Sequence, residues 1–530
     1  MSSDAVIIGK NIIEILTTGM YHNPLVIFRE YVQNSVDAIN EAISREILKD
    51  ISEGDIQIVI DKKERRISFE DNGIGIPKEN AWQILTSIAA SDKDRTKNLG
   101  FRGIGRLAGL AYCNELIIET SFKGEATKTV LQWDGQKLKE IIGDKKDRRL
   151  ASEVIEAITT INEELMEQEG DHYFKVTLQE VKNTKLLDVD AVTKYLRMVA
   201  PVDFYDPKFV FTSKVKKGLV DRGIPCEGYR IFVNTNQLFK AYHHNVYKQE
   251  KKQKKRIDEV IDIEFFDLYS KNNHLLAVGW YAITKYMQLI PVVNEAWGIR
   301  LRKGNIQVGD EFTLQRFFRE NRFHRYFVGE IHVLHEELFP NGQRDYFDEC
   351  ELLSEFEDAL HGLTSKLQNI CRKASEWNSA EKKVENYADQ IEKFEDTLET
   401  QEFYSPEHEK EEKDKLDKIR ENAEKAKKQL KRIEQHAEDN ETLARFVQYR
   451  SSNNTEKKNT ELPKKDKGNT SEKKGNGKKY KANKLSKLSR KEQKLVGEIY
   501  EVIRTILPPD LQNVLIYKIE ERFGITKSHE

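Results

Sequence analysis

The chain has 530 residues, enough for roughly three to four domains of ordinary size. Hydrophobic residues make up 38% and charged residues 33%, which predicts folded domains joined to solvated helical or disordered segments. The net charge of −2 excludes a chain that is basic throughout, so any contact with nucleic acid must be local.

The four cysteines, Cys113, Cys226, Cys350 and Cys371, are far apart and form no C-x-x-C pair. This spacing argues against a zinc site and against a disulfide framework. The N-terminus has no basic region followed by an apolar run, and no stretch of about 18 apolar residues occurs. We therefore expect a cytosolic protein with no membrane partner.

The predicted elements of residues 1–180 alternate between helices and strands. Apolar spacing predicts two helices within 5–48, broken at Asn23-Pro24, where Asn23 can cap the second helix. Alternating residues predict a hairpin, two further strands and a last strand that closes the domain, and a charged stretch predicts a helix before that last strand. In chain order these elements lie at 56–60 with 67–70, 115–121, 129–133, 146–168 and 173–178.

Beyond residue 180 the pattern changes three times. Residues 181–375 alternate helical and strand patterns and predict a second α+β domain. Heptads in 376–448, interrupted at Pro406, predict either a hairpin coiled coil or one broken seam in a parallel dimer. Residues 449–487 predict a disordered Lys-rich linker. The last segment, 488–530, holds two short amphipathic helices that we expect to dock or self-associate.

The first chemical motif lies at 28–38 and reads FREYVQNSVDA. Glu30, Asn34 and Asp37 are spaced so that they share one face of a helix. A carboxylate beside an amide can activate a water molecule and hold Mg²⁺, which prefers oxygen ligands. A solvated polar face would give the same pattern, so this motif alone does not decide between the two.

Two glycine-rich turns follow. DNGIGI at 71–76 comes directly after a strand, where Asp71 can accept a hydrogen bond from an exocyclic amine and the glycines let the backbone approach a ligand. GFRGIGR at 100–106 opens a predicted helix and can cradle phosphate, and the hydroxyls and the lysine upstream suit a closing lid. Each turn alone is also typical of an ordinary tight turn.

Together, in this order and spacing, the three motifs resemble the GHKL superfamily. That group includes DNA gyrase B subunits, ninety-kilodalton heat-shock chaperones, histidine kinases, MutL-type repair proteins and MORC ATPases, and the stretch 14–38 looks most like the chaperones. The resemblance implies an α+β chain: a Bergerat α/β sandwich that binds ATP and Mg²⁺, followed by a transducer-type α+β domain, the coiled-coil helical hairpin and the small helical segment.

The resemblance also implies residue roles. Glu30 would be the general base, Asn34 would bind Mg²⁺, Asp71 would recognise adenine, and Asp37 would support the site. The remaining residues would shape the pocket and lid: Gly73, Gly75, Ile76, Ser91, Lys93, Gly100, Arg102, Gly103, Ile104 and Gly105.

One departure from the family pattern concerns adenine. The family usually has a Gly-Thr pair before the last strand, and here the stretch 170–178 reads GDHYFKVTL without it. Either Thr177 or another group replaces that contact, or the contact is absent.

Two loops of the second domain extend the resemblance. GIRLRKGN at 298–305 resembles the transducer loop of split GHKL ATPases, which makes Lys303 the candidate for contacting the γ-phosphate. PNGQRD at 340–345 resembles the catalytic arginine loop of the chaperones and makes Arg344 a second catalytic candidate. Cations there would offset charge on the transferring phosphoryl group. A basic surface loop is the alternative for each.

The sequence therefore predicts an ATPase that works as an ATP-gated dimeric clamp, chaperone-like or MORC-like. Its client, protein or DNA, stays open, as do a stress or phage-defence role and a partner subunit with an effector activity. The alternative is a non-hydrolysing scaffold that ATP switches and that recruits proteins through the coiled coil. A histidine kinase is excluded because no phosphoacceptor helix precedes the ATP motifs, and a type II topoisomerase because the chain lacks room for a cleavage domain.

Overall fold

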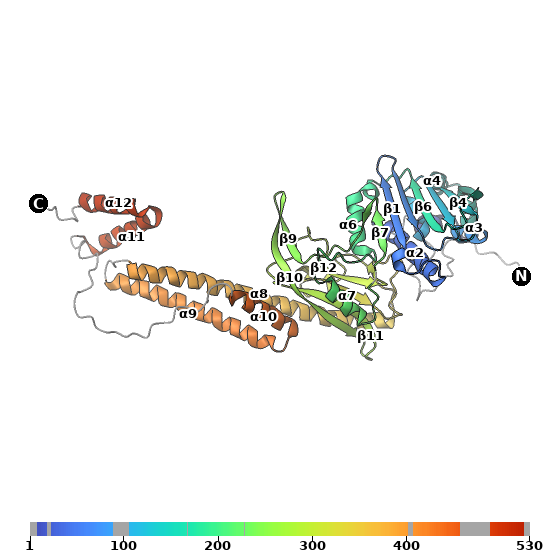
Figure 1. Ribbon diagram of the computed structural model, residues 1–530. Coiled ribbons are helices and arrows are strands. Elements are labelled where there is room, and N and C mark those ends of the chain that lie inside the picture. Colours follow the sequence, from blue (N-terminus) through green and yellow to red (C-terminus); the bar gives the residue numbers. More distant parts are fainter. Residues whose placement is uncertain are drawn as a thin grey trace. The chain divides into compact units, whose positions relative to one another are not determined.

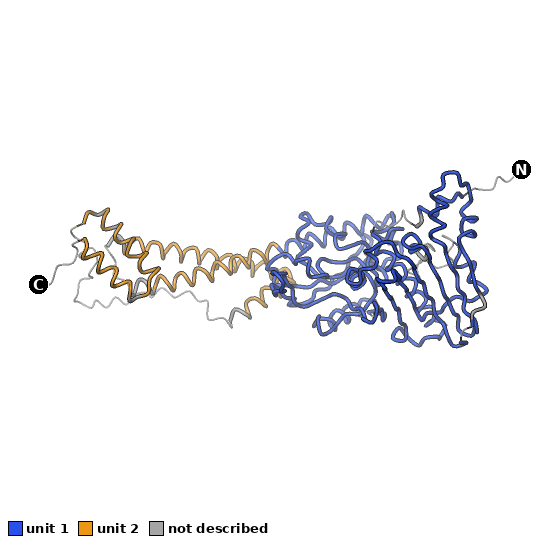
Figure 2. Tube along the Cα trace, turned by 90° about the horizontal axis from the view of Figure 1, so that it is seen from above, with its two compact units in different colours: residues 1–371 blue, residues 372–530 orange. Residues whose placement is uncertain are grey.

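The computed structural model describes residues 8–17, 23–87, 105–166, 168–226, 228–400, 406–455 and 488–523. The chain divides into two compact units, residues 1–371 and 372–530 (Figure 2). Within the described ranges, no helix is both long enough and apolar enough to cross a membrane.

The first sheet of unit 1 has eight strands in the order β5-β4-β3-β6-β2-β1-β7-β8. Neighbours are antiparallel except for β1 and β7, which run parallel. The strands are β1 Asp55–Asp61, β2 Arg66–Asp71, β3 Glu115–Ser121, β4 Thr127–Asp134, β5 Thr159–Met166, β6 Tyr173–Gln179, β7 Arg230–Val233 and β8 Asn236–Gln237.

Helices cover this sheet, and the longest of them is α2 (Figure 1). Its aromatic residues pack on the sheet, with the Phe28 and Tyr31 rings 5.2 and 4.5 Å from the Phe69 ring. Asn23 Oδ1 accepts a hydrogen bond from the Leu25 amide just before the helix, at 3.2 Å. We call this sheet with its helices the first lobe, and the second sheet of unit 1 with its helices the second lobe. The helices of the first lobe are α1 Asn11–Thr17, α2 Val26–Ser44, α3 Lys78–Thr86, α4 Gly135–Gly143, α5 Ala151–Ile158 and the 3₁₀ helix η2 Gly105–Ala111.

The predicted helix over 146–168 is wrong in its second half. α5 ends at Ile158, and the next residues form β5, which pairs with the edge of β4. Thr159, Thr160 and Ile161 are β-branched and suit a strand, and pairing with β4 outweighs the helical preference of the glutamates that follow. The predicted strand at 173–178 is β6, which lies in the middle of the sheet, and β7 and β8 join the same sheet from beyond residue 180. The predicted division into domains stays a prediction.

The second sheet of unit 1 has six strands in the order β13-β12-β14-β11-β10-β9. Helix α7 packs against β10 and β11, while α6 contacts α2 and so links the two lobes. The elements are α6 Val189–Val199, α7 Thr212–Val220, β9 Asn245–Glu250, β10 Gln253–Tyr269, β11 Leu275–Thr284, β12 Gly298–Lys303, β13 Ile306–Val308 and β14 Val328–Val333.

Unit 2 is helical. α8 (Glu351–Thr400) enters it from unit 1, and α9 (Pro406–Ala437) folds back beside α8 (Figures 1 and 2). A small core of Ile391, Leu416 and Ala423 joins the two helices. α10 (Glu441–Thr455) occupies the first residues of the predicted linker, and the rest of that linker, 456–487, lies outside the described residues. The terminal helices are α11 Arg490–Ile506 and α12 Pro509–Arg522.

Candidate functional site

Helix α2 carries the predicted acid, amide and acid. Glu30 and Asp37 are buried and Asn34 is half-buried. Their spacing along the helix places all three on one side of α2. A buried carboxylate on a helix needs a partner or a function, so the solvated polar face that the sequence left open does not describe Glu30.

Two arginines contact Glu30. Arg29 Nη2 lies 3.3 Å from Glu30 Oε1, and Arg344 Nε lies 3.6 Å from the same oxygen. Arg29 also donates to the backbone carbonyl of Gln343 at 3.1 Å, so the loop of the second lobe is tied to α2 twice. Tyr195 of α6 lies close by, and burial, opposed by Arg29, raises the pKa of its hydroxyl to about 12. The predicted base and the predicted arginine therefore meet.

Backbone contacts hold the Arg344 loop in place. Arg344 has a positive φ of 54°, its amide donates to the Asn341 carbonyl at 3.0 Å, and its own carbonyl accepts from the Gly309 amide at 2.8 Å. A non-glycine residue in this backbone region persists only where the surroundings impose it. The loop thus presents Arg344 to Glu30 in a constrained conformation.

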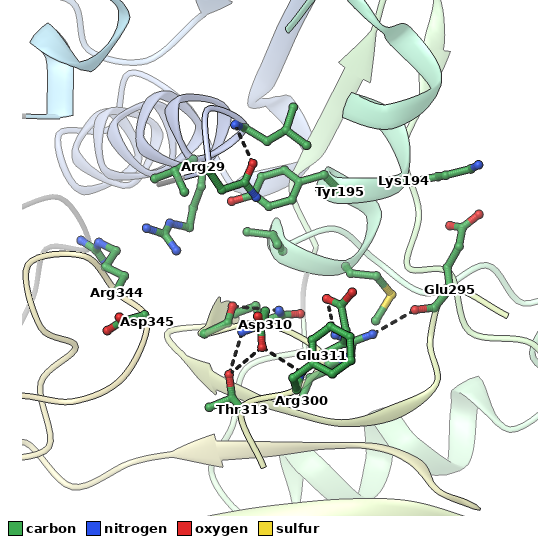
Figure 3. Close-up of a pocket in the computed structure, with 18 of the residues that line it drawn as sticks. Arg29, Lys194, Tyr195, Glu295, Arg300, Asp310, Glu311, Thr313, Arg344 and Asp345 are labelled. Carbon is green, nitrogen blue, oxygen red and sulfur yellow. Dashed lines mark hydrogen bonds and ion pairs between the residues drawn. The ribbon is translucent and has the colours of Figure 1, made fainter. Parts of the chain in front are cut away.

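A cavity of about 640 Å³ lies beside this contact, between α2, α6 and loops of the second lobe (Figure 3). Its wall mixes cations and acids. Arg300, which is buried, donates to the Glu295 carbonyl at 3.0 Å and pairs with Glu311 at 3.4 Å. The charged lining residues are Arg29, Lys194, Glu295, Arg300, Asp310, Glu311, Arg344 and Asp345.

The turn after β2 forms a tight cradle. Asp71 is buried at the end of β2, and its Oδ1 accepts from the Gly73 amide at 3.0 Å. Gly75 has a φ of 70°, and a Cβ there would lie 1.9 Å from the Ser121 carbonyl oxygen. The Ile76 amide donates to Thr120 Oγ1 at 2.8 Å. Only glycine fits at position 75, as expected of a turn built for close backbone approach.

The adenine contact that the sequence left open does not fall on Thr177. Thr177 pairs with Ser68, and alternation along the strands puts it on the sheet face opposite to Asp71. The residue directly opposite Asp71 on β6 is Phe174, whose side chain cannot donate a hydrogen bond. Thr120 of β3 lies opposite Phe174 on its other side. His172 Nδ1 lies 2.8 Å from the Gly73 carbonyl oxygen. Since that carbonyl only accepts, Nδ1 is the donor.

Part of the predicted lid cannot be placed. Ser91, Lys93, Gly100, Arg102, Gly103 and Ile104 lie outside the described residues. Gly105 is the first residue of η2, a short 3₁₀ helix where the sequence predicted the start of a helix. The phosphate-cradling role of this segment stays a prediction.

Lys303 is a described residue, and its described contacts do not include Glu30. Lys303 ends β12, and its Nζ donates to the carbonyls of Leu334 and His335 at 3.2 and 2.7 Å. Strand alternation puts it on the face opposite to Arg300 and Arg302, and Arg302 contacts the Met198 carbonyl of α6. Burial lowers the pKa of Lys303 to about 8. Its contact with a γ-phosphate stays a prediction that requires movement.

A buried ionic cluster centres on Glu330 of β14. Its carboxylate contacts Arg302 Nε at 2.5 Å, Lys240 Nζ at 2.9 Å, the Tyr242 hydroxyl at 3.0 Å and His332 Nε2 at 3.1 Å. Burial alone would raise the pKa of Glu330, but Arg302 and Lys240 outweigh burial and hold this pKa well below its usual range. One carboxylate therefore compensates two buried cations in the second lobe.

The donors present fit ATP and a single Mg²⁺ ion. Gly75 lets the turn pack directly against the Ser121 carbonyl, and Asp71 is a buried acceptor at the start of that turn. Mg²⁺ keeps several waters and takes few protein ligands beside substrate phosphates, so Asn34 alone on α2 suffices as its protein ligand. The described residues hold no cluster of three or more His, Cys, Asp or Glu that could bind a metal without a nucleotide.

Comparison with known proteins agrees with this geometry. Residues 22–167 match the family described as histidine kinase-, DNA gyrase B-, and HSP90-like ATPase. The chaperone protein HtpG of Buchnera aphidicola from Acyrthosiphon pisum is 30% identical over 142 residues, or 24% of this chain and 23% of that protein. HtpG of Shewanella loihica is 25% identical over 142 residues, covering 24% and 22%. HtpG of Buchnera aphidicola from Schizaphis graminum is 25% identical over 177 residues, covering 30% and 28%.

These matches confirm the GHKL, HSP90-like resemblance and the α+β class for the first lobe. Residues 22–167 of this lobe match a GHKL-type, HSP90-like ATPase domain. The matched part spans only about a quarter of the length of these relatives. The activity of the whole relatives is therefore not assigned to this chain. The sequence did not single out Arg29, Thr120, His172, Tyr195 or Arg300, because their place in the site depends on contacts between distant segments.

Proposed function

We propose that the chain is a Mg²⁺-dependent ATPase that works as an ATP-gated homodimeric clamp. The contact of Arg344 with Glu30 carries this proposal, because it joins the ATPase domain to the second lobe at the predicted general base. A clamp needs such a link, since the nucleotide state has to reach parts of the chain that do not bind ATP.

The chemistry would proceed as follows. Asp71 accepts a hydrogen bond from the adenine amine, and the Gly73–Ile76 turn lies against the base. Asn34 would hold the Mg²⁺ ion, and that ion when bound would offset the charge of the phosphates. Glu30 accepts a proton from the attacking water as the water oxygen bonds to the γ-phosphorus. The bond to the β-phosphate oxygen breaks, and ADP leaves with that electron pair.

The two arginines define a resting state and an active state. In this structure Arg29 and Arg344 both contact Oε1 of Glu30, so one of the two carboxylate oxygens of the proposed base is paired with cations. Movement of Arg344 toward the γ-phosphate would release Glu30 and add positive charge where the transition state needs it. The loop at 340–345 would thereby report the presence of nucleotide to the second lobe.

Phe174 favours a second candidate. An aromatic residue stands opposite Asp71 in the ladder, so the adenine end has fewer hydrogen-bond donors in that row. Weaker nucleotide contacts suit a scaffold that ATP switches without hydrolysis. The client, protein or DNA, is part of neither argument, although the relatives are chaperones by name.

Steady-state turnover with Mg²⁺ separates the candidates, measured with and without duplex DNA and with Glu30→Ala as control. Turnover in the wild type that falls to background in Glu30→Ala supports the ATPase. Binding of ATP without turnover above that control would leave the scaffold. Light scattering during size-exclusion chromatography, with and without a non-hydrolysable ATP analogue, then tests whether nucleotide pairs two chains.

A further inference from the structure

The hairpin of β9 and β10 projects from the second sheet as a two-stranded ribbon (Figure 1). We call residues 247–256 the basic ribbon. Between 248 and 256 it carries six cations, Lys248, Lys251, Lys252, Lys254, Lys255 and Arg256, and one acid, Glu250. All of these side chains are exposed. The chain as a whole has a net charge of −2, so this concentration of positive charge is local.

The ribbon places like charges against one another. Lys248 lies directly opposite Lys255 in the ladder, an arrangement that destabilises a hairpin. Lys255 has a distant partner in Glu250 at 4.0 Å, and Arg256 pairs with Glu259. Within the described ranges, no acid forms an ion pair with Lys248, Lys251, Lys252 or Lys254. An external anion would relieve this repulsion.

The turn of the ribbon has lysines at positions where the backbone conformation favours other residues. Lys251 and Lys252 form the two-residue connection, and Lys251 has a φ of 54°. Hairpin turns of this length prefer glycine or asparagine at positive φ. A lysine at this position costs stability that a glycine would not, and it puts an ammonium group at the tip.

The positive surface continues to the base of the ribbon among aromatic rings. Tyr247 stacks edge-on with His243 at 5.2 Å, and His243 stacks with His244 at 4.9 Å. Lys208 lies over the Tyr205 ring at 5.7 Å. Burial first, then His244, Lys208 and Lys254, lower the pKa of His243. Lys208, from the segment between α6 and α7, thus adds positive charge near the base of the ribbon.

We propose that the basic ribbon binds the phosphate backbone of duplex nucleic acid. Lysines supply the charge that such contacts use, and a two-stranded ribbon has the width of the major groove. A membrane is the weaker fit, because the described residues between 245 and 256 expose no large apolar side chain that could enter the lipid interface. This inference adds duplex nucleic acid as a partner of the proposed clamp. The contact between ribbon and duplex itself requires no ATP hydrolysis.

The test compares two matched pairs of lysines in the full chain. Lys251→Glu/Lys252→Glu changes the turn of the ribbon, and Lys62→Glu/Lys63→Glu changes the turn of the β1–β2 hairpin, where both lysines are also exposed. Affinity for a fluorescein-labelled random duplex is measured by anisotropy over a series of salt concentrations. The Lys-rich segment 456–487 is present in both variants, so its contribution cancels.

The ribbon variant should bind the duplex at least tenfold more weakly, while the β1–β2 variant binds like the wild type. The slope of log affinity against log salt should fall by about 0.9 for each lysine that contacts a phosphate. Equal affinities and slopes in all three proteins would overturn the proposal, as would equal losses in both variants. Binding to phosphatidylserine vesicles is measured on the same three proteins. If the ribbon variant binds the duplex normally but loses vesicle binding, the ribbon contacts a membrane instead.

A second measurement needs no variant. Acetylation of lysines in the wild type, read by mass spectrometry, should show that the duplex protects Lys251 and Lys252 but not Lys62 and Lys63. Equal protection of both pairs would contradict the ribbon contact even if the variants misfold. Duplex binding without ATP turnover would sink the proposed ATPase and leave this inference standing, and turnover without ribbon-dependent binding would do the reverse.

Discussion

Arg344 Nε lies 3.6 Å from Glu30 Oε1, so a loop of the second lobe contacts the helix that carries the predicted base. The neighbouring Arg29 contacts the same oxygen and also binds the backbone of Gln343. This junction is the only place in the described residues where a predicted catalytic group of the second lobe reaches one of the first. It therefore yields the sharpest test of the clamp.

Arg344→Ala should lower kcat by about a hundredfold, the usual effect of removing one group that stabilises transition-state charge. The Kd for ATP should change little, because Arg344 lies on the Glu30 side of α2 and not at the Asp71 turn. Turnover and equilibrium binding are measured on the same preparation. Arg316→Ala, which removes an exposed arginine paired with Glu357, is the matched control. Unchanged kcat in Arg344→Ala would remove the arginine from the mechanism.

Asp71→Asn should weaken ATP binding at least tenfold, because the buried acceptor for the adenine amine becomes an amide that also presents donors. Isothermal titration calorimetry with ATP and GTP measures the effect, and the preference for ATP should shrink. Asp61→Asn, which changes a half-buried aspartate at the other end of the β1–β2 hairpin, should leave both affinities unchanged. An intact preference for ATP in Asp71→Asn would place adenine elsewhere.

Lys303 predicts a pH dependence. Burial lowers its pKa to about 8, so the ammonium group is charged below that pH and neutral above it. If its charge contacts the γ-phosphate, kcat/KM falls as the pH rises through about 8, because kcat/KM reports the free enzyme. Lys303→Arg should move this fall to higher pH, since the guanidinium stays charged. The same fall in Lys303→Arg would show that another group titrates.

The pKa shift of Lys303 also has a consequence for stability. The folded pKa of about 8 lies below the ordinary lysine value of 10.5, so the unfolded chain binds more protons between these values. The contribution of Lys303 to the free energy of unfolding therefore rises with pH across that window. Lys303→Met should flatten this part of a denaturation series measured against pH.

Glu330→Gln should lower the free energy of unfolding by about 3–5 kcal/mol, because Arg302 and Lys240 would stay buried without a counter-charge. Urea denaturation measures the loss. Glu357→Gln, which changes one partner of the exposed pair with Arg316, should cost less than about 1 kcal/mol. Similar losses in the two variants would mean that water or rearrangement already compensates the cluster.

The sequence alone predicts the parts of the candidate site that are local. The spacing of Glu30, Asn34 and Asp37 needs only one helix, and the Asp71 turn needs only a strand followed by glycines. The β1–β2 hairpin follows from apolar alternation, because alternate residues of its strands are buried. Helix α2 follows from helical apolar spacing, although its residues from Val26 to Gln33 are buried on every side. Such features are set within a few residues of one another.

The remainder depends on segments that meet only after folding. β5 looked helical because its glutamates favour helices, and only pairing with β4 makes it a strand. β7 joins β1 in parallel from residue 230 onward, which no local pattern records. Phe174 and Thr120 share a row with Asp71 through strand register, and register is invisible in a single sequence.

The seam between α8 and α9 is closed within one chain, since Arg420 Nη2 of α9 contacts Glu395 Oε1 of α8 at 2.5 Å beside the Ile391 core. A partner tethered in this way is present at an effective concentration set by the connection and not by the sample. The helix pair should therefore persist on dilution. The dissociation constant of any dimer will then report contacts other than the α8–α9 seam. Truncations that keep α8 and α9 intact can show which surfaces make those contacts.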